Sequence, residues 1–202
     1  MPRTAKKGAS ASRAVVEQVY APTRAAWRRW LAKNHTRDAG VWLIFDKLIV
    51  TGKRLDYAHA VEEALCFGWI DSTLRSLDEK QYMQLFAPRK PKSTWSRVNK
   101  ERVSRLMADG LMMPPGHASI ELAKRNGAWE SLDGVESLSV PDDLRQALAR
   151  NPNAARNFDA FSPSSRKGYL HWLNSAKRPE TRASRIAEIV SLSEQNRKSR
   201  HL

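Results

Sequence analysis

Residues 67–88, FGWIDSTLRSLDEKQYMQLFAP, set the architecture of this chain. Two runs with strand-type composition, 67–76 and 81–88, flank a polar segment at 77–80, and this pattern predicts a β-hairpin. If Ser76 faces Gln81, then Asp71 faces Phe86 and alternation sorts the side chains onto two faces. The predicted core face carries Ile70, Leu74, Met83 and Leu85. The other, polar and aromatic, face carries Trp69, Asp71, Thr73, Arg75, Tyr82, Gln84 and Phe86.

Working outward, the hairpin is preceded by a predicted strand at about 41–50 and followed by helices. Trp27, Trp30 and Leu31 have helical spacing in a segment that ends near residue 35, and Asp56 is a good N-cap for a helix over 57–66. After the hairpin, Ser96 caps a helix to about 109. A turn is expected at 114–116 and a loop at 129–139, and further helices are expected at about 118–126, 141–150, 153–161, from 162 and from 179. We therefore expect an α+β fold: a small antiparallel sheet (hairpin about 67–88 plus strand about 41–50) packed with helices, then an all-helical C-terminal part.

The expected domains are a disordered basic arm at 1–14, an α+β domain at 15–135 and a helical C-terminal subdomain at 136–202. The last two are alternatively one continuous domain. The chain has 202 residues and a formal net charge of +14, which attracts polyanions or simply keeps an arginine-rich protein soluble. The single cysteine, Cys66, excludes an intramolecular disulfide and suits a reducing cytosol. No run approaches the roughly 18 apolar residues of a membrane span, so a cytoplasmic location is expected.

Four motifs occur in a fixed order along the chain. They are Ala-Leu-Cys-Phe-Gly-Trp-Ile-Asp at 64–71, Phe-x-Pro-Arg-Lys at 86–90, Ser-x-Trp-Ser at 93–96 and Ala-Lys-Arg-Pro-Glu-Thr-Arg at 176–182. Together they resemble the YdeI/OmpD-associated family, whose members are often labelled bacteriocin-protection proteins, and the resemblance runs from about Trp27 to Ile189. It implies a bacterial, cytoplasmic protein linked to stress or bacteriocin tolerance. It supplies no catalytic residues to carry over.

The polar face of the hairpin and the segment after it form the candidate ligand-binding site. Cations beside aromatic rings suit nucleotides or single-stranded nucleic acid, and Ser96 lies at a helix N-terminus, where backbone N–H groups favour anions. The candidate residues are Trp69, Asp71, Arg75, Tyr82, Phe86, Arg89, Lys90, Ser93, Trp95, Ser96, Asn99 and Lys100. The simpler alternative is an Asp71–arginine pair that ties the sheet to the helices.

A secondary basic patch is predicted on the last helix, at Lys177, Arg178, Arg182 and Arg185. The last three have i, i+4, i+7 spacing, which indicates either an extended phosphate track or a solvated helix face. Cys66 lies between Leu65 and Phe67, so it is expected to be a small buried side chain rather than a nucleophile. The histidines lack metal-type spacing and no phosphate or dinucleotide loop is present, so no metal and no cofactor are expected.

These observations favour a non-enzymatic binder of an anionic ligand, either nucleic acid or a nucleotide. One alternative is an enzyme on a small anionic substrate, with Asp71 as acid or base and Arg89 and Lys100 as clamps. Another is an interaction module for an acidic protein partner. Nucleic acid or another polyanion is the partner that the charge suggests, and the sequence leaves the oligomeric state open.

Overall fold

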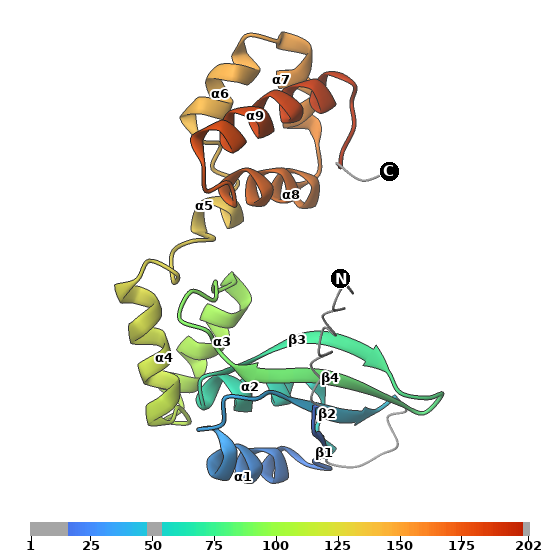
Figure 1. The fold of residues 1–202 in the computed structure, drawn as a ribbon, viewed down its shortest axis with the longest axis vertical. Helices are drawn as coiled ribbons and strands as arrows, with labels where there is room; N and C mark the ends of the chain where they lie inside the picture. The colour runs from blue at the N-terminus through green and yellow to red at the C-terminus, as the bar shows by residue number, and fades with distance from the viewer. Residues whose placement is uncertain (1–15, 48–53, 200–202) are drawn as a thin grey trace, which may run out of the picture. The chain divides into compact units, whose positions relative to one another are not determined.

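The computed structural model describes residues 16–47 and 54–199, so the arm predicted at 1–14 and the strand end predicted at 48–50 lie outside it. The chain divides into two compact units. The first unit is Met1–Lys90 with Leu106–Ser119, and the second is Pro91–Arg105 with Ile120–Leu202. The chain therefore enters the second unit twice and returns to the first between the two visits. Figure 1 labels the elements of both.

The first unit contains a four-stranded sheet in the order β1-β2-β4-β3, which confirms the α+β class. The strands are β1 (Gln18–Tyr20), β2 (Val41–Asp46), β3 (Trp69–Ser76) and β4 (Gln81–Pro88). Strands β2, β4 and β3 pair antiparallel, as predicted. Strand β1, which sequence reasoning missed, pairs parallel to β2 and makes the sheet mixed. With three residues, β1 is too short to show an alternating pattern.

The hairpin has the predicted register at one end only. Asp71 pairs with Phe86 as predicted, but Arg75 pairs with Met83 rather than with Tyr82. Two residues of β3, at 72 and 73, therefore oppose a single residue of β4, which is a β-bulge. One extra residue turns the side chains beyond it to the opposite face. The guanidinium of Arg75 accordingly lies 4.7 Å from the ring centroid of Trp42.

The predicted core face of the hairpin was wrong. Trp69 and Phe86 are fully buried, whereas Leu74 is 62% exposed. Helix α1 (Arg24–Asn34) covers the face that carries the two rings. Trp27 meets Phe86 edge-on at 5.5 Å, and Trp30 meets Trp69 at 5.8 Å. The sheet therefore turns the two rings inward, where each packs edge-on against an indole of α1.

Helix α2 (Tyr57–Cys66) lies beside α1 and has the bounds predicted from its cap. The Asp56 side chain accepts a hydrogen bond from the backbone N–H of His59 at 2.8 Å. The indole Nε1 of Trp27 donates to the carbonyl of Ala60 at 3.1 Å and ties the two helices together. Cys66, at the end of α2, is buried as predicted.

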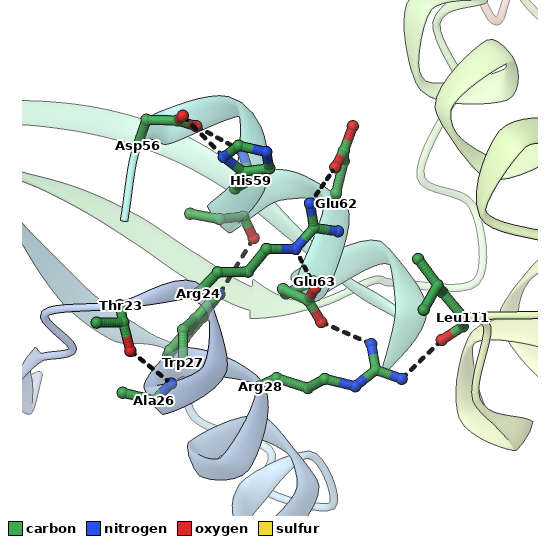
Figure 2. A network of polar contacts seen from close by, with 11 residues as sticks. Thr23, Arg24, Ala26, Trp27, Arg28, Asp56, His59, Glu62, Glu63 and Leu111 are labelled. Carbon is green, nitrogen blue, oxygen red and sulfur yellow. Dashed lines mark hydrogen bonds and ion pairs between the residues drawn. The ribbon is translucent and has the colours of Figure 1, made fainter. Parts of the chain in front are cut away.

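A buried ion cluster also joins α1 to α2, as Figure 2 shows. Glu63 is a carboxylate whose side chain is only 3% exposed. One of its oxygens accepts from Arg24 Nε at 2.5 Å and the other from Arg28 Nη1 at 2.7 Å. Arg28 also donates to the carbonyl of Leu111 at 2.8 Å, while Arg24 pairs with Glu62 at 3.0 Å. The cluster therefore fixes α1, α2 and the returning segment of the first unit.

The helices after the hairpin begin with α3 (Arg97–Ala108) and α4 (Pro114–Arg125), each of which begins in one unit and ends in the other. The turn predicted at 114–116 is the first turn of α4, because proline is favoured at the first position of a helix. The loop predicted at 129–139 contains the short helix α5 (Asp133–Glu136).

Four helices, α6 to α9, form the core of the second unit and confirm an all-helical C-terminal part (Figure 1). They are α6 (Asp142–Ala149), α7 (Pro152–Ala160), α8 (Pro163–Asn174) and α9 (Pro179–Glu194). Leu144, Phe158, Leu170, Leu173 and Ile189 are fully buried among them. Ser162 caps α8, in agreement with the start predicted at 162, whereas Asn151 caps α7, which begins one residue before the predicted 153.

Candidate functional site

The structure distributes the predicted ligand-binding residues over both units. The first unit holds Trp69, Asp71, Arg75, Tyr82, Phe86, Arg89 and Lys90. The second holds Ser93, Trp95, Ser96, Asn99 and Lys100. Each group is a local arrangement of its own.

In the first unit, the Asp71 carboxylate is held between the sheet and helix α2. Its Oδ2 accepts from the Tyr57 hydroxyl at 2.7 Å and from Gln84 Nε2 at 3.2 Å. The Gln84 amide, 3% exposed, also donates to the carbonyl of Ser72 at 3.2 Å. That carbonyl lies in the bulge, where the regular ladder is interrupted and another donor is needed. Asp71 and Gln84 thus stabilise the bulge and its attachment to α2, and Tyr57 is a partner that sequence reasoning missed.

Arg89 follows β4 and belongs to the same neighbourhood as Asp71. Burial lowers the pKa of Arg89 to about 10, and the negative charge of Asp71 opposes this shift. The guanidinium therefore stays cationic at neutral pH, in surroundings that disfavour its charge. The backbone N–H of Arg89 donates to the carbonyl of Gly68 at 2.9 Å, which fixes the chain at this point.

The aromatic members of the predicted site in the first unit belong to the core. Trp69 and Phe86 are fully buried, so the expectation that they offer a stacking surface was wrong. Tyr82 stacks on Phe45 with ring centroids 5.0 Å apart, and burial raises the pKa of its phenol. Lys90, in contrast, is exposed.

In the second unit, predicted and unpredicted residues meet around Trp129. Trp95 is buried and its ring centroid lies 4.9 Å from that of Trp129, which is half-buried. The ammonium groups of Lys100 and Lys124 lie 5.2 Å and 5.9 Å from the Trp129 centroid. Lys100 also pairs with Asp133 at 2.5 Å. We call Trp95, Lys100, Lys124, Trp129 and Asp133 the Trp129 cluster.

The remaining predicted residues of the second unit make local contacts. Ser96 Oγ accepts from the backbone N–H of Asn99 at 3.3 Å, which confirms it as a cap of α3. Asn99 Oδ1 accepts from Arg102 Nη1 at 2.9 Å, and Ser93 is half-buried. Their polar groups support the loop and the first turn of α3.

The secondary basic patch on α9 divides into two pairs. Arg182 makes two hydrogen bonds to Asp143 of α6, at 2.5 and 3.0 Å, and these lower the pKa of that carboxyl. Arg185 Nη1 donates to the carbonyl of Trp172 at 2.5 Å. Lys177 and Arg178 are exposed. Arg182 and Arg185 therefore tie α9 to its neighbours, and the exposed basic surface is smaller than the sequence pattern suggested.

Burial is the main cause that raises the pKa of the Cys66 thiol, and the charge of Glu63 adds to it. The thiol is therefore a poor nucleophile in the folded chain. Within residues 16–47 and 54–199, no group of three or more His, Cys, Asp or Glu side chains is arranged to hold a metal ion. None of the helices in these ranges is long and apolar enough to cross a membrane.

Comparison with family models assigns both parts of the chain. Residues 19–119, half of the chain, match the model described as "Domain of unknown function (DUF8412)", and the chain belongs to this family. Residues 137–196 match the model described as "Bacteriocin-protection, YdeI or OmpD-Associated", which confirms the predicted family resemblance and assigns it to helices α6 to α9. The motifs at 64–71, 86–90 and 93–96 lie in the first match, and only the motif at 176–182 lies in the second. Searches of curated proteins and of solved structures gave no match.

Proposed function

We propose that this protein is a non-enzymatic binder of an anionic ligand, single-stranded nucleic acid or a nucleotide, that acts in stress or bacteriocin tolerance in the bacterial cytoplasm. The match of α6 to α9 to the bacteriocin-protection model supports the biological context. The net charge of +14 supports the sign of the ligand.

The observation that carries the proposal is the charge of residues 89–105. This segment contains seven lysines and arginines, and Glu101 is its single acidic residue. Lys90 and Lys92 are exposed on the loop before α3. A backbone of phosphates would neutralise these cations and release its own counterions, which is the main source of affinity in such complexes.

The Trp129 cluster adds an aromatic element to the same surface segment. Asn126 Nδ2 donates to the carbonyl of Pro91 at 2.7 Å, so the basic loop is attached to the chain that leads into Trp129. A half-buried indole beside the ammonium groups of Lys100 and Lys124 combines a ring face with positive charge. Proteins that bind single strands without sequence preference use this combination.

A salt-titrated binding experiment tests the proposal. Fluorescence anisotropy of labelled oligo(dT), oligo(U) and duplex DNA would be measured with the wild type and with the double variant Lys90→Gln/Lys92→Gln. For single strands, two lost phosphate contacts reduce the slope of log K against log salt by about 1.4. The matched control is Lys177→Gln/Arg178→Gln, which removes the same charge from two exposed positions farther along the chain.

The control is expected to leave the slope unchanged. Equal effects of the two double variants would show generic attraction to a basic protein, and no binding at about 50 mM salt would remove the nucleic-acid proposal. A partner captured from lysate that survives nuclease treatment but is lost in Lys90→Gln/Lys92→Gln would instead favour an acidic protein.

A second candidate, an enzyme on a small anionic substrate, is favoured by one specific observation. The Asp71 carboxylate and the Tyr57 hydroxyl form a 2.7 Å pair at the edge of α2, in the neighbourhood of the Arg89 cation. Asp71→Asn keeps the hydrogen bonds to its neighbours approximately in place and removes the base. If bacteria carrying Asp71→Asn remain as protected against bacteriocin as the wild type, this candidate fails.

A further inference from the structure

A cavity of about 300 Å³ lies in the second unit, away from the basic segment 89–105 in sequence. Its lining residues come from α8 and from the chain that follows α9: Ser164, Ser165, Gly168, Tyr169, Trp172, Lys198 and Ser199. A volume of this size is at the lower end of the range for small-molecule sites. The cavity can therefore hold one ring system with its substituents.

The glycine at position 168 is the first observation that favours a ligand in this cavity. Glycine inside a helix is less favourable than alanine by about 1 kcal/mol. Gly68, Gly110 and Gly127 are the described glycines with positive φ, so the backbone at Gly168 does not need a glycine. A Cβ at Gly168 would meet nothing within 4 Å, so close packing against a neighbouring residue does not require a glycine here either. The missing side chain instead enlarges the cavity.

The half-buried Trp172 supplies most of the apolar wall, and Tyr169, only 2% exposed, contributes little more than a ring edge. The Tyr169 hydroxyl donates to the carbonyl of Arg197 at 2.8 Å, so the polar end of this residue is already engaged. The guanidinium of Arg185 lies 5.0 Å from the Trp172 ring centroid and donates to Ser175 Oγ at 2.7 Å. These contacts hold the indole in position, which gives Arg185 of the predicted basic patch a positioning role.

The polar lining is suited to an anion. Ser164 and Ser165 lie in the first turn of α8, where the N-terminal end of the helix carries partial positive charge. Ser162 caps this turn by accepting from the backbone N–H of Ser165 at 3.3 Å. Lys198, from the chain after α9, adds a positively charged side chain to the lining. Hydroxyl and ammonium donors therefore share a cavity with two aromatic rings.

We propose that this cavity binds a small molecule made of one aromatic or heteroaromatic ring system and one anionic group. The ring packs against Trp172 in the space beside Gly168, and the anionic group faces Lys198 and the serine hydroxyls. Nucleoside monophosphates and aromatic carboxylic acids share this chemistry. The site lies on different residues from the nucleic-acid surface proposed above, so it is a separate binding activity of the chain.

Isothermal titration of the full chain distinguishes the two ligand sources. The probes are AMP and indole-3-acetate, with adenosine and indole as their uncharged counterparts. We expect at least one anion to bind with 1:1 stoichiometry, and its uncharged counterpart to bind about tenfold more weakly, as the loss of a charge-assisted hydrogen bond predicts. AMP alone would indicate a nucleotide site, and indole-3-acetate alone would indicate a carboxylate site.

Two variants locate the binding. Gly168→Leu fills the cavity and is expected to weaken the anion about tenfold or more, while its melting temperature stays at or above that of the wild type because glycine is removed from a helix. Lys198→Gln, outside the helices, should weaken the anion and leave the uncharged probe unchanged. The double variant Lys90→Gln/Lys92→Gln should bind the probes like the wild type. The proposal is overturned if neither anion binds, or if both Gly168→Leu and Lys198→Gln bind the anion as tightly as the wild type.

Discussion

Replacing Glu63 with glutamine tests the buried ion cluster between α1 and α2. The variant keeps the size of the side chain but removes its charge and places an NH₂ group among guanidinium donors. Burial acts to lower the pKa of Arg24 and of Arg28, yet the hydrogen bonds and charge of Glu63 raise both values overall. The carboxylate is thus the group that makes the two partly buried cations favourable.

The expected loss follows from the exposure of the three side chains. Removing one partner of a fully buried pair costs about 3–5 kcal/mol, because the other charge is left uncompensated. Glu63 is 3% exposed, but Arg24 and Arg28 are 34% and 30% exposed, so water partly solvates them after the change. We therefore expect Glu63→Gln to lower the free energy of unfolding by about 2–3 kcal/mol.

The matched control is Glu62→Gln, on the same helix and one residue away. Glu62 pairs with Arg24 at 3.0 Å and is more exposed than Glu63, at 18%, so its loss should cost about 0.5–1 kcal/mol. Urea unfolding followed by tryptophan fluorescence measures both. With a slope of about 2 kcal/mol per molar, Glu63→Gln should shift the midpoint by about 1–1.5 M.

The reasoning fails if Glu63→Gln is no more destabilising than Glu62→Gln. It would then be the packing of the helices, and not the charge at Glu63, that holds α1 to α2. A triple variant, Arg24→Met/Arg28→Met/Glu63→Leu, provides a further check. Because it leaves no uncompensated charge, it should be more stable than Glu63→Gln alone.

Three further predictions concern other parts of the chain. The Cys66 thiol, buried and with a raised pKa, should react with DTNB only as fast as the chain unfolds, and rapid labelling of the native protein would contradict its burial. Arg182 lowers the pKa of Asp143, so their pairing stabilises the fold above the unfolded carboxyl pKa of about 3.9 and is lost as pH falls through the folded value. The difference in thermal stability between the wild type and Arg182→Gln should therefore be present at neutral pH and shrink steadily as the pH falls below about 3.9, whereas a constant difference would show that charge is not its source. Gly116→Ala would place a Cβ 2.3 Å from the carbonyl oxygen of Cys66 and should cost about 2 kcal/mol or more in urea unfolding, whereas Gly134→Ala, with nothing within 4 Å, should cost little.

Structural features that depend on residues close together in the chain, such as helix caps and the hairpin, could be predicted from the sequence. Helix α2 begins after Asp56 because a carboxylate satisfies the first free N–H groups, and this depends on residues three positions apart. The hairpin was predicted from its turn and its two strand-like runs. Its core face was not, because alternation sorts side chains onto two faces without showing which face the helices cover, and the bulge at 72–73 further displaced Arg75. Nothing within the hairpin shows that α1 supplies two indoles to bury Trp69 and Phe86.

The candidate site shows the same limit. Asp71 was identified as a carboxylate in need of partners, but the Tyr57 hydroxyl reaches it from another element. Lys124 and Trp129 lie about thirty residues from Trp95, and no periodicity connects such distant positions. The +14 charge predicts an anionic partner in general, whereas the cavity beside Gly168 depends on a tertiary arrangement of α8 and the chain after α9.

Because the chain enters the second unit twice, its two units become complete in a fixed order during synthesis. The sheet and the first two helices are made by residue 90, but the first unit is complete only when Leu106–Ser119 has left the ribosome. By then Pro91–Arg105 has already emerged, and Trp95 must wait for Trp129 before its ring is covered. The Trp95 indole of a ribosome-bound nascent chain thus stays exposed beside a strongly basic loop while about thirty further residues are synthesised. Chaperones or RNA can bind the chain during this time.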